Sequence, residues 1–221
     1  MTDTIKIGVL SDIHGDLVGL KKAAAIFESQ QVKGVLCLGD LVDRGPNPND
    51  VVAWIRRHEV VCIKGNHEHS LLDNQSLYRQ SVKSDSYQKI GRLLSEETVA
   101  YLNALPEIRT LTIRGQHILM AHGTPWSDIL GVFPDSRATT LQRLFRDYAA
   151  NIILLGHTHQ PMVIKAGNRT ILNPGSVYDI TQRDSGTCAC LTLPAGVFQV
   201  FDLKSQKVFP IQPRYLSIPN G

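Results

Sequence analysis

The sequence has no long hydrophobic run and no block of basic residues. No stretch reaches the roughly 18 consecutive apolar residues that a membrane-spanning helix needs, and residues 1–10 carry too short an apolar run for a secretory signal. Lys and Arg never occur in runs longer than a pair, and the formal net charge is +3. We therefore expect a soluble, cytoplasmic protein that binds neither a membrane nor nucleic acid.

Cysteine is also scarce, with four residues, Cys37, Cys62, Cys188 and Cys190, that all lie inside apolar stretches. Cys188 and Cys190 would share one face of a strand, but no second pair at zinc-ligand spacing accompanies them. The sequence therefore predicts small buried hydrophobic side chains at these positions and no structural zinc.

The hydrophobic pattern predicts an α/β protein whose residues 1–221 form one domain with a substantial core. Short runs rich in Val, Ile and Leu indicate buried strands at 5–10, 34–39, 60–65, 117–123 and 152–157. Two helical patterns, at 17–29 and 47–57, separate the first three runs. The first third should therefore be β-α-β-α-β.

The second half alternates short strand-like runs with turn signals, a pattern typical of β-hairpins. A Gly-containing turn near Gly115 separates two strand-like runs, and turn signals recur between 162 and 210. Residues 69–84 and 124–138 show no clear period and carry turn-forming residues, so we expect loops in both places.

Polar residues follow each of the five predicted strands. They are Asp12 and His14 after the first, Asp40, Asp43 and Arg44 after the second, Asn66 and His67 after the third, His122 after the fourth, and His157 and His159 after the fifth. In α/β folds, sites form beyond the carboxyl ends of the strands, where loops carry polar groups without disturbing the core. We therefore expect these side chains to meet at one rim.

The donor types indicate a metal centre. Carboxylate, imidazole and amide groups without thiolates suit divalent Mn, Fe, Zn or Ni. Seven candidate ligands exceed the four of a closed zinc site, and one carboxylate can bridge two ions roughly 3.5 to 4 Å apart. The seven are Asp12, His14, Asp40, Asn66, His122, His157 and His159. We expect two divalent transition-metal ions, with manganese the first candidate, and with His157 and His159 serving one ion each.

The order of these motifs, SDIHGD, GDLVDRG, GNHE, AHG and GHTH, resembles the calcineurin-like metallophosphoesterase superfamily from about residue 5 to at least residue 176. ILNPGSV, at 171–177, is similar to an element of its small phosphodiesterase-type members. The resemblance implies a four-layer αββα sandwich, in which helices flank two mixed β-sheets.

The resemblance also implies a ligand set for each ion. One metal would be held by Asp12, His14, Asp40 and His159. The other would be held by Asp40 as a bridge, with Asn66, His122 and His157.

The same resemblance implies a phosphoesterase mechanism. His67 is similar to the family histidine that contacts the phosphate and protonates the leaving oxygen. A metal-bridging hydroxide would attack phosphorus. Arg44 could add a forked contact to a phosphoryl oxygen, and Asp43 could hold the second ring nitrogen of His67.

Several substrates stay open, because the motifs mix two branches of the superfamily. GDLVDRG and GNHE resemble protein Ser/Thr phosphatases and diadenosine tetraphosphatases, whereas GHTH and NPGS resemble broad small phosphoesterases. We expect a small phosphate-ester substrate, with a nucleotide or a phosphoprotein as alternatives. A non-catalytic scaffold, like the retromer subunit of the superfamily, is a further alternative that the presence of His67 disfavours.

The stretch 124–138 has two interpretations. It leaves directly from His122 and could cap the site, with Trp126 or Phe133 stacking on a base, or it could be an ordinary surface loop. The sequence gives no indication of an oligomeric state.

Overall fold

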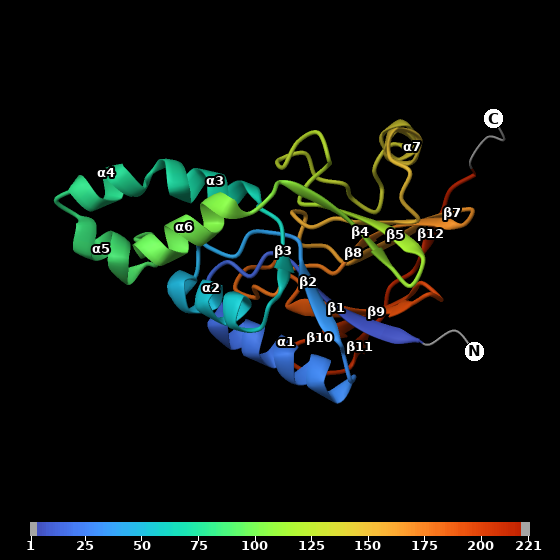
Figure 1. Cartoon of the computed structure of the whole chain (residues 1–221), viewed down its shortest axis with the longest axis horizontal. Coiled ribbons are helices and arrows are strands. Elements are labelled where there is room, and N and C mark those ends of the chain that lie inside the picture. Colours follow the sequence, from blue (N-terminus) through green and yellow to red (C-terminus); the bar gives the residue numbers. More distant parts are fainter. Residues whose placement is uncertain (1–3, 218–221) are drawn as a thin grey trace.

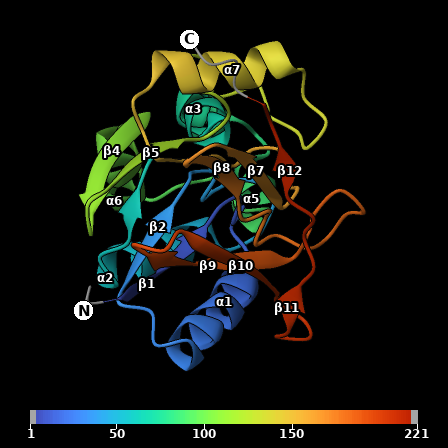
Figure 2. The same cartoon turned by 90° about the vertical axis from the view of Figure 1, so that its right-hand side faces the viewer.

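The computed structural model describes residues 4–217 and confirms a four-layer α/β sandwich. Two six-stranded mixed sheets lie face to face within the described residues, with helix α1 outside one sheet and helix α7 outside the other (Figure 2). The helices are α1 (Leu17–Ser29), α2 (Pro48–Arg57), α3 (Asn66–Asp73), α4 (Gln75–Gln80), α5 (Ser84–Lys89), α6 (Glu96–Ala104) and α7 (Ala138–Asp147). The strands are β1 (Ile5–Leu10), β2 (Gly34–Cys37), β3 (Val61–Cys62), β4 (Ile108–Ile113), β5 (Gln116–Ala121), β6 (Ile152–Leu154), β7 (Met162–Ala166), β8 (Arg169–Asn173), β9 (Thr187–Leu193), β10 (Val197–Asp202), β11 (Val208–Phe209) and β12 (Arg214–Tyr215).

Each sheet combines parallel and antiparallel pairs. The first has the order β11-β10-β9-β1-β2-β3, in which β1, β2 and β3 run parallel and β9 joins β1 antiparallel. The second has the order β12-β7-β8-β6-β5-β4, in which β5, β6 and β8 run parallel. The carboxyl ends of the parallel strands therefore lie together at one edge of each sheet.

Three layers of buried hydrophobic side chains hold the sandwich together. The middle layer joins the two sheets and includes Val9 and Leu36 of the first with Leu154 and Leu172 of the second. A second layer lies between the first sheet and helices α1 and α2, and a third lies between the second sheet and α7. Burial of this apolar surface is the main force that stabilises the stacked layers.

The predicted β-α-β-α-β start is confirmed. Helix α1 begins after Asp16, whose side chain accepts a hydrogen bond of 2.8 Å from the Gly19 N–H and caps the helix. Helix α2 begins with Pro48, which has no N–H to satisfy in the first turn. Strands β2, β3 and β6 end earlier than predicted, because the last residues of each run already belong to the polar loops.

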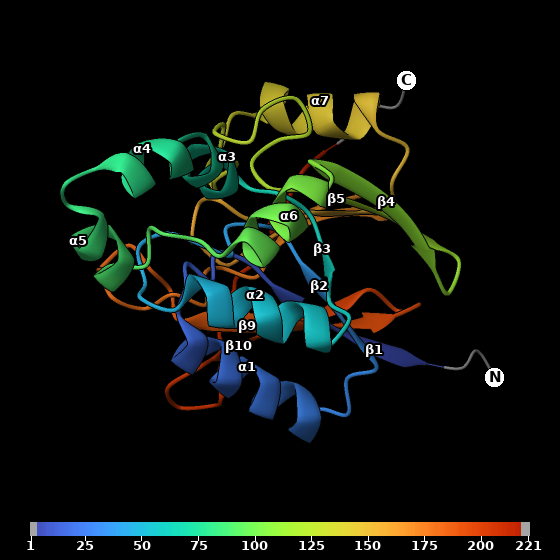
Figure 3. The same cartoon turned by 60° about the vertical axis from the view of Figure 1, so that its left-hand side comes forward.

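The predicted loop at 69–84 is wrong, because α3 and α4 occupy most of this region and α5 begins at its last residue, Ser84. These short helices project from the sandwich together with α6 (Figures 1 and 3). Non-local contacts of Gln75 help to hold this region: its amide donates to the Arg92 carbonyl, and its oxygen accepts from the Leu94 N–H. Contacts of this kind produce no periodic pattern of apolar residues, so the sequence did not indicate these helices.

The hairpins of the second half are confirmed as β4–β5, β7–β8 and β9–β10. Most of 124–138 is loop as predicted, and α7 follows it. The four cysteines are free and buried. Among residues 4–217, no helix is both long enough and apolar enough to cross a membrane.

Candidate metal centre

The polar loops after five strands meet at the edge where the two sheets come together. The backbone links them directly: the Asp12 N–H donates to the Gly39 carbonyl at 3.1 Å, and the Gly156 N–H donates to the His122 carbonyl at 2.7 Å. The His122 ring crosses between the sheets, with Nδ1 2.7 Å from the Leu38 carbonyl. The polar loops after the five strands therefore meet at one rim, as expected.

The backbone is bent into an unusual conformation at these loops. Seven of the ten predicted site residues have φ in the left-handed region, namely Asp12, His14, Asp40, Asp43, Arg44, His157 and His159. Left-handed conformations are uncommon outside glycine and cluster at functional sites, where they cost about 1–3 kcal/mol each. Neighbouring Gly39 has φ +93°, and a side chain there would lie 2.6 Å from the Gly65 nitrogen.

One group of candidate ligands forms around Asp12. His159 Nε2 lies 3.2 Å from Asp12 Oδ1, and His14 Nε2 lies 3.2 Å from His159 Nε2. Asp40 Oδ2 is 3.8 Å from His14 Nε2. The structure thus brings the first predicted ligand set together, almost completely shielded from solvent.

A second group forms on the other side of Asp40. His122 Nε2 lies 3.1 Å from Asp40 Oδ2 and 3.1 Å from Asn66 Oδ1. His157 Nδ1 is 3.0 Å from the same Asn66 oxygen. The second predicted ligand set is therefore also assembled, and Asp40 stands between the two groups.

The arrangement fits divalent cations. Asp12 Oδ1 is buried without a hydrogen-bond partner among the described residues, and such orphaned buried acceptors are rare. Two imidazole nitrogens also face each other across 3.2 Å at His14 and His159. A cation would satisfy these lone pairs, and nitrogen and oxygen donors without sulfur match Mn, Fe, Zn or Ni.

In three of the candidate histidine ligands, a contact at Nδ1 leaves Nε2 facing the centre. Nδ1 of His14 faces the Val42 carbonyl at 3.3 Å, and Nδ1 of His122 faces the Leu38 carbonyl, so both rings turn Nε2 inward. His159 is held by a carboxylate instead, with Nδ1 2.6 Å from Asp184 Oδ1. This support is typical of metal-binding histidines.

The charge states also favour cation binding. Burial raises the pKa of Asp12 and Asp40, but nearby histidines outweigh it and lower both, so the carboxylates stay ionised. Burial lowers the pKa of His14 to about 4, which leaves a neutral imidazole able to donate a lone pair. Burial also opposes the charge on His122, but Asp40 raises its pKa to about 10. A bound cation would compete with that proton.

His67 lies at the edge of this centre. Its Nδ1 is 2.8 Å from Asp43 Oδ2, as anticipated, and its Nε2 is 4.0 Å from Asp40 Oδ2. Burial lowers the pKa of His67, but the hydrogen bond to Asp43 and the negative charges of Asp40 and Asp43 together outweigh it, so the net shift is upward. Accordingly, the pKa of Asp43 falls to about 2, chiefly through the same hydrogen bond. The pair holds a proton beside the candidate ligands.

Arg44 is 39% exposed, and its Nη1 lies 3.9 Å from Asp184 Oδ1. The guanidinium therefore borders the centre rather than pointing into open solvent.

Three supporting residues were not among the predicted site residues. Asp184 holds His159, and Arg92 approaches Asp43, with Nε 3.4 Å from Oδ1. Glu68 accepts four backbone N–H groups from the loops around Asp40 and Gly65. Only Glu68 had a local signal, its place in GNHE; Asp184 and Arg92 had none.

The loop 124–138 borders the centre. Gly131 lies against Thr158 and His157, so close that a side chain at Gly131 would come within 2.7 Å of Thr158 Cγ2. The Trp126 ring is covered by the Arg143 guanidinium at 3.9 Å, whereas Phe133 is 42% exposed. Of the two aromatic residues, Phe133 is the one free to meet a ligand.

Comparison with known proteins identifies the family of this chain. Residues 5–196 match the model of the calcineurin-like phosphoesterase superfamily domain. An uncharacterized protein of Methanocaldococcus jannaschii is 28% identical over 186 residues, which cover 78% of this chain and 70% of that protein. A symmetrical bis(5'-nucleosyl)-tetraphosphatase of Methylobacillus flagellatus is 32% identical over 84 residues, 37% of this chain and 30% of its own.

Among solved structures, a metallophosphoesterase from Sphaerobacter thermophilus superposes with a TM-score of 0.69 at 23% identity. The match covers 93% of this chain and 86% of the other. It shows that the two chains share the fold.

Proposed function

Since this chain belongs to the calcineurin-like phosphoesterase superfamily, we propose that it hydrolyses small phosphate mono- or diesters with two divalent metal ions. The observation that carries the proposal is the close approach of His159 and His14 to the buried Asp12 Oδ1, an oxygen that accepts no hydrogen bond among the described residues. A buried cluster of this kind has no structural purpose that an apolar core would not serve better.

The proposed ligand sets follow the two groups around Asp40. One ion would be held by Asp12, His14, Asp40 and His159, and the other by Asp40, Asn66, His122 and His157. When bound, such ions neutralise charge on phosphoryl oxygens and lower the pKa of a water nucleophile. Manganese is the first candidate, with iron, zinc or nickel as alternatives.

His67 is proposed to donate the proton that the leaving oxygen needs. Asp43 binds Nδ1, so Nε2 is the nitrogen available to the substrate. The upward shift of its pKa favours the protonated ring, which is the form that a general acid requires. Asp43 is then a positioning residue that maintains both the ring orientation and the proton.

Arg44 is proposed to bind a phosphoryl oxygen. Its guanidinium borders the candidate ligands and is only loosely paired with Asp184, and a planar fork suits a phosphate better than lysine does. A phosphate monoester carries one more charge than a diester, so Arg44→Ala should raise KM more for monoesters.

A second candidate function is dinucleoside tetraphosphatase or protein Ser/Thr phosphatase activity. Asp43 and Arg44 favour it, because they stand in the GDLVDRG motif of those branches. The partial match to the tetraphosphatase supports it over part of the chain. A binding platform without catalysis is the alternative of another class.

A panel of substrates distinguishes these candidate functions. Metal-stripped protein is titrated with manganese, zinc, nickel and magnesium and assayed on p-nitrophenyl phosphate, bis-p-nitrophenyl phosphate, diadenosine tetraphosphate and a phosphopeptide. Metal-dependent turnover supports the hydrolase, and the preferred substrate selects the branch. Binding of two ions per chain without turnover of any substrate would instead support a platform.

A further inference from the structure

Two pockets adjoin the candidate metal centre from different sides. The larger has a volume of about 550 Å³ and is lined by Arg44, Phe133, His157, His159, Thr181 and Arg183, among others. Its size lies within the range of about 300–1,000 Å³ typical of small-molecule sites. Because His157 and His159 form part of its wall, a group bound there would be attached close to the reacting phosphate.

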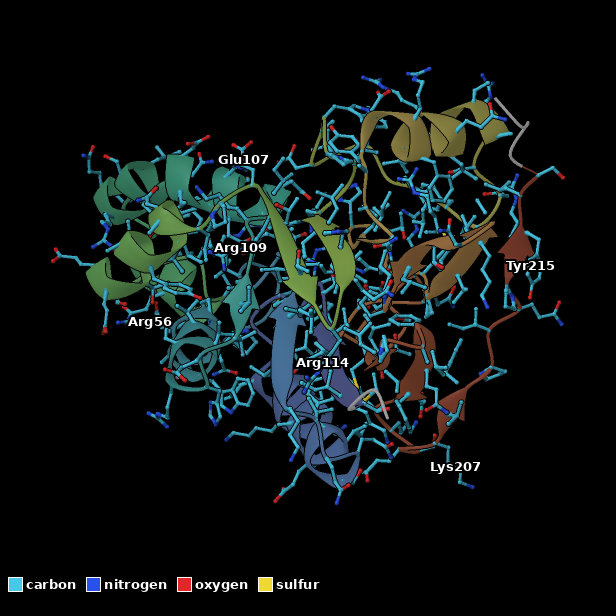
Figure 4. The ribbon with its side chains drawn as sticks, turned by 45° about the vertical axis from the view of Figure 1, so that its right-hand side comes forward. Arg56, Glu107, Arg109, Arg114, Lys207 and Tyr215 are labelled. Atoms are coloured by element: carbon cyan, nitrogen blue, oxygen red, sulfur yellow. The ribbon has the colours of Figure 1, made fainter. Side chains whose placement is uncertain are left out.

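The two pockets differ in charge. The larger contains Arg44 and Arg183, and the acid in its wall, Asp184, is already paired with His159. The smaller, of about 230 Å³ beside His122, contains Glu107 and Asp128, which lie 3.8 and 4.0 Å from His69 Nε2, and its described lining contains no arginine or lysine. Glu107 lies where helix α6 leads into strand β4 (Figure 4). An anionic group on the substrate is therefore favoured in the larger pocket, which has two arginines, over the smaller one, which has two acids.

The two arginines are available for a ligand. Arg44 makes one long ion pair, at 3.9 Å, and Arg183 is exposed. No hydrogen bond engages either guanidinium within residues 4–217. Both can therefore donate to phosphate oxygens without first breaking a hydrogen bond to the protein.

Phe133 is presented on a firmly held turn. Its N–H donates to Ser136 Oγ at 2.8 Å, its carbonyl accepts from the Ser136 N–H, and Arg214 donates to the carbonyls of Pro134 and Ser136. The ring nevertheless stays 42% exposed at the pocket wall. An exposed aromatic ring on a fixed backbone is suited to stacking against a planar base.

We propose that this pocket, lined by Arg44, Arg183 and Phe133, is a subsite for a nucleoside diphosphate group, which makes nucleoside polyphosphates the preferred substrate class. The inference rests on the proposed function. Arg183 would bind a second phosphate and Phe133 would stack on the base, while the reacting phosphate lies at the metal centre. The reaction is hydrolysis: water adds to phosphorus, one P–O bond breaks, and the leaving oxygen takes a proton.

The test measures binding of orthophosphate, AMP and ADP to the full chain by isothermal titration calorimetry. The protein carries His67→Ala to suppress turnover, and each titration is made with manganese and without metal. We expect ADP to bind about tenfold or more tightly than AMP, and AMP to bind more tightly than orthophosphate. Arg183→Ala should reduce ADP binding to the level of AMP, whereas Arg57→Ala, on the outer surface of α2, should change nothing.

The base contact is tested separately. Phe133→Leu keeps an apolar side chain but removes the stacking face, so AMP and ADP should both weaken by about fivefold or more. Phe133→Trp should restore their binding. Orthophosphate should be unaffected by either change.

The experiments distinguish an error in the proposed subsite from an error in the proposed hydrolase activity. If p-nitrophenyl phosphate is hydrolysed but ADP binds no better than orthophosphate, the subsite is wrong and the enzyme assignment stands. The subsite is also wrong if Arg183→Ala behaves like Arg57→Ala. If no ester is hydrolysed with any metal, the proposed function is wrong, and the binding series still decides whether the pocket accepts a nucleoside diphosphate.

Discussion

His159 and Asp184 are joined by a hydrogen bond of 2.6 Å between Nδ1 and Oδ1. The other carboxylate oxygen accepts the Thr181 N–H at 2.8 Å, so the aspartate is itself held in place. This contact turns His159 Nε2 toward Asp12, 3.2 Å away. Asp184 therefore acts as a positioning residue for the candidate metal centre, although it contacts none of the other predicted ligands.

We predict that Asp184→Asn weakens binding of one metal ion by about 10- to 100-fold, as loss of such a supporting carboxylate typically does. The second ion should be less affected, because its ligands lie around His122. Manganese titration followed by electron paramagnetic resonance measures both sites directly. Asp179→Asn, an exposed change in the same loop, is the matched control, and equal affinities in the two variants would contradict the role of Asp184.

His67→Ala should lower turnover by about 10²- to 10⁴-fold, the usual contribution of a general acid. Metal content should stay at the wild-type level, because His67 donates to Asp43 and is proposed not to bind an ion. Steady-state kinetics and elemental analysis of the same preparation test both statements. His117→Ala changes an exposed histidine of β5 and should leave both quantities alone; a His67 variant that loses metal would reassign the residue as a ligand.

Asp43→Asn should alter the pH profile of kcat. The hydrogen bond that His67 donates to Asp43 raises the pKa of His67, so its loss should lower that pKa. A general acid must be protonated, and activity falls as pH rises through its pKa, so the alkaline limb of the profile should move to lower pH. A uniform loss of activity at every pH, with the limb unmoved, would show that Asp43 has only a structural effect.

The sequence predicted that the candidate ligands lie together, because its signals are local. Each candidate ligand directly follows a buried strand, and parallel strands bring their carboxyl ends to one edge. The seven ligands and the Asp43–His67 contact could therefore be anticipated from spacing and resemblance. Asp184 could not, because it lies 25 residues beyond His159 in a polar loop and only tertiary folding brings the two together.

Helices α3 to α5 and α7 were not predicted from the sequence, for two different reasons. Helices α3 to α5 depend on contacts such as Gln75 with Arg92 and Leu94, which leave no periodic pattern. Helix α7, by contrast, buries Leu141, Leu144 and Phe145 at helical spacing. That pattern was present in the sequence and would have identified α7.

Glu68 joins the two loops that carry Asp40 and Asn66. One carboxylate oxygen accepts the N–H groups of Leu41 and Val42 at 2.7 and 3.3 Å, and the other accepts those of Asp40 and Gly65 at 2.8 and 2.7 Å. The side chain is completely buried. The carboxylate therefore satisfies donors that water cannot reach.

Glu68→Gln should consequently destabilise the fold by about 2–3 kcal/mol. The amide keeps the size of the side chain, but its NH₂ group cannot accept, so one pair of backbone N–H groups loses its acceptor in a buried site. Urea unfolding of metal-stripped protein measures the change in the free energy of unfolding without interference from bound ions. Glu28→Gln, on the exposed face of α1, should have almost no effect. If the two variants were equally stable, Glu68 would not hold the loops together, and the left-handed backbone at Asp40 would need another source of support.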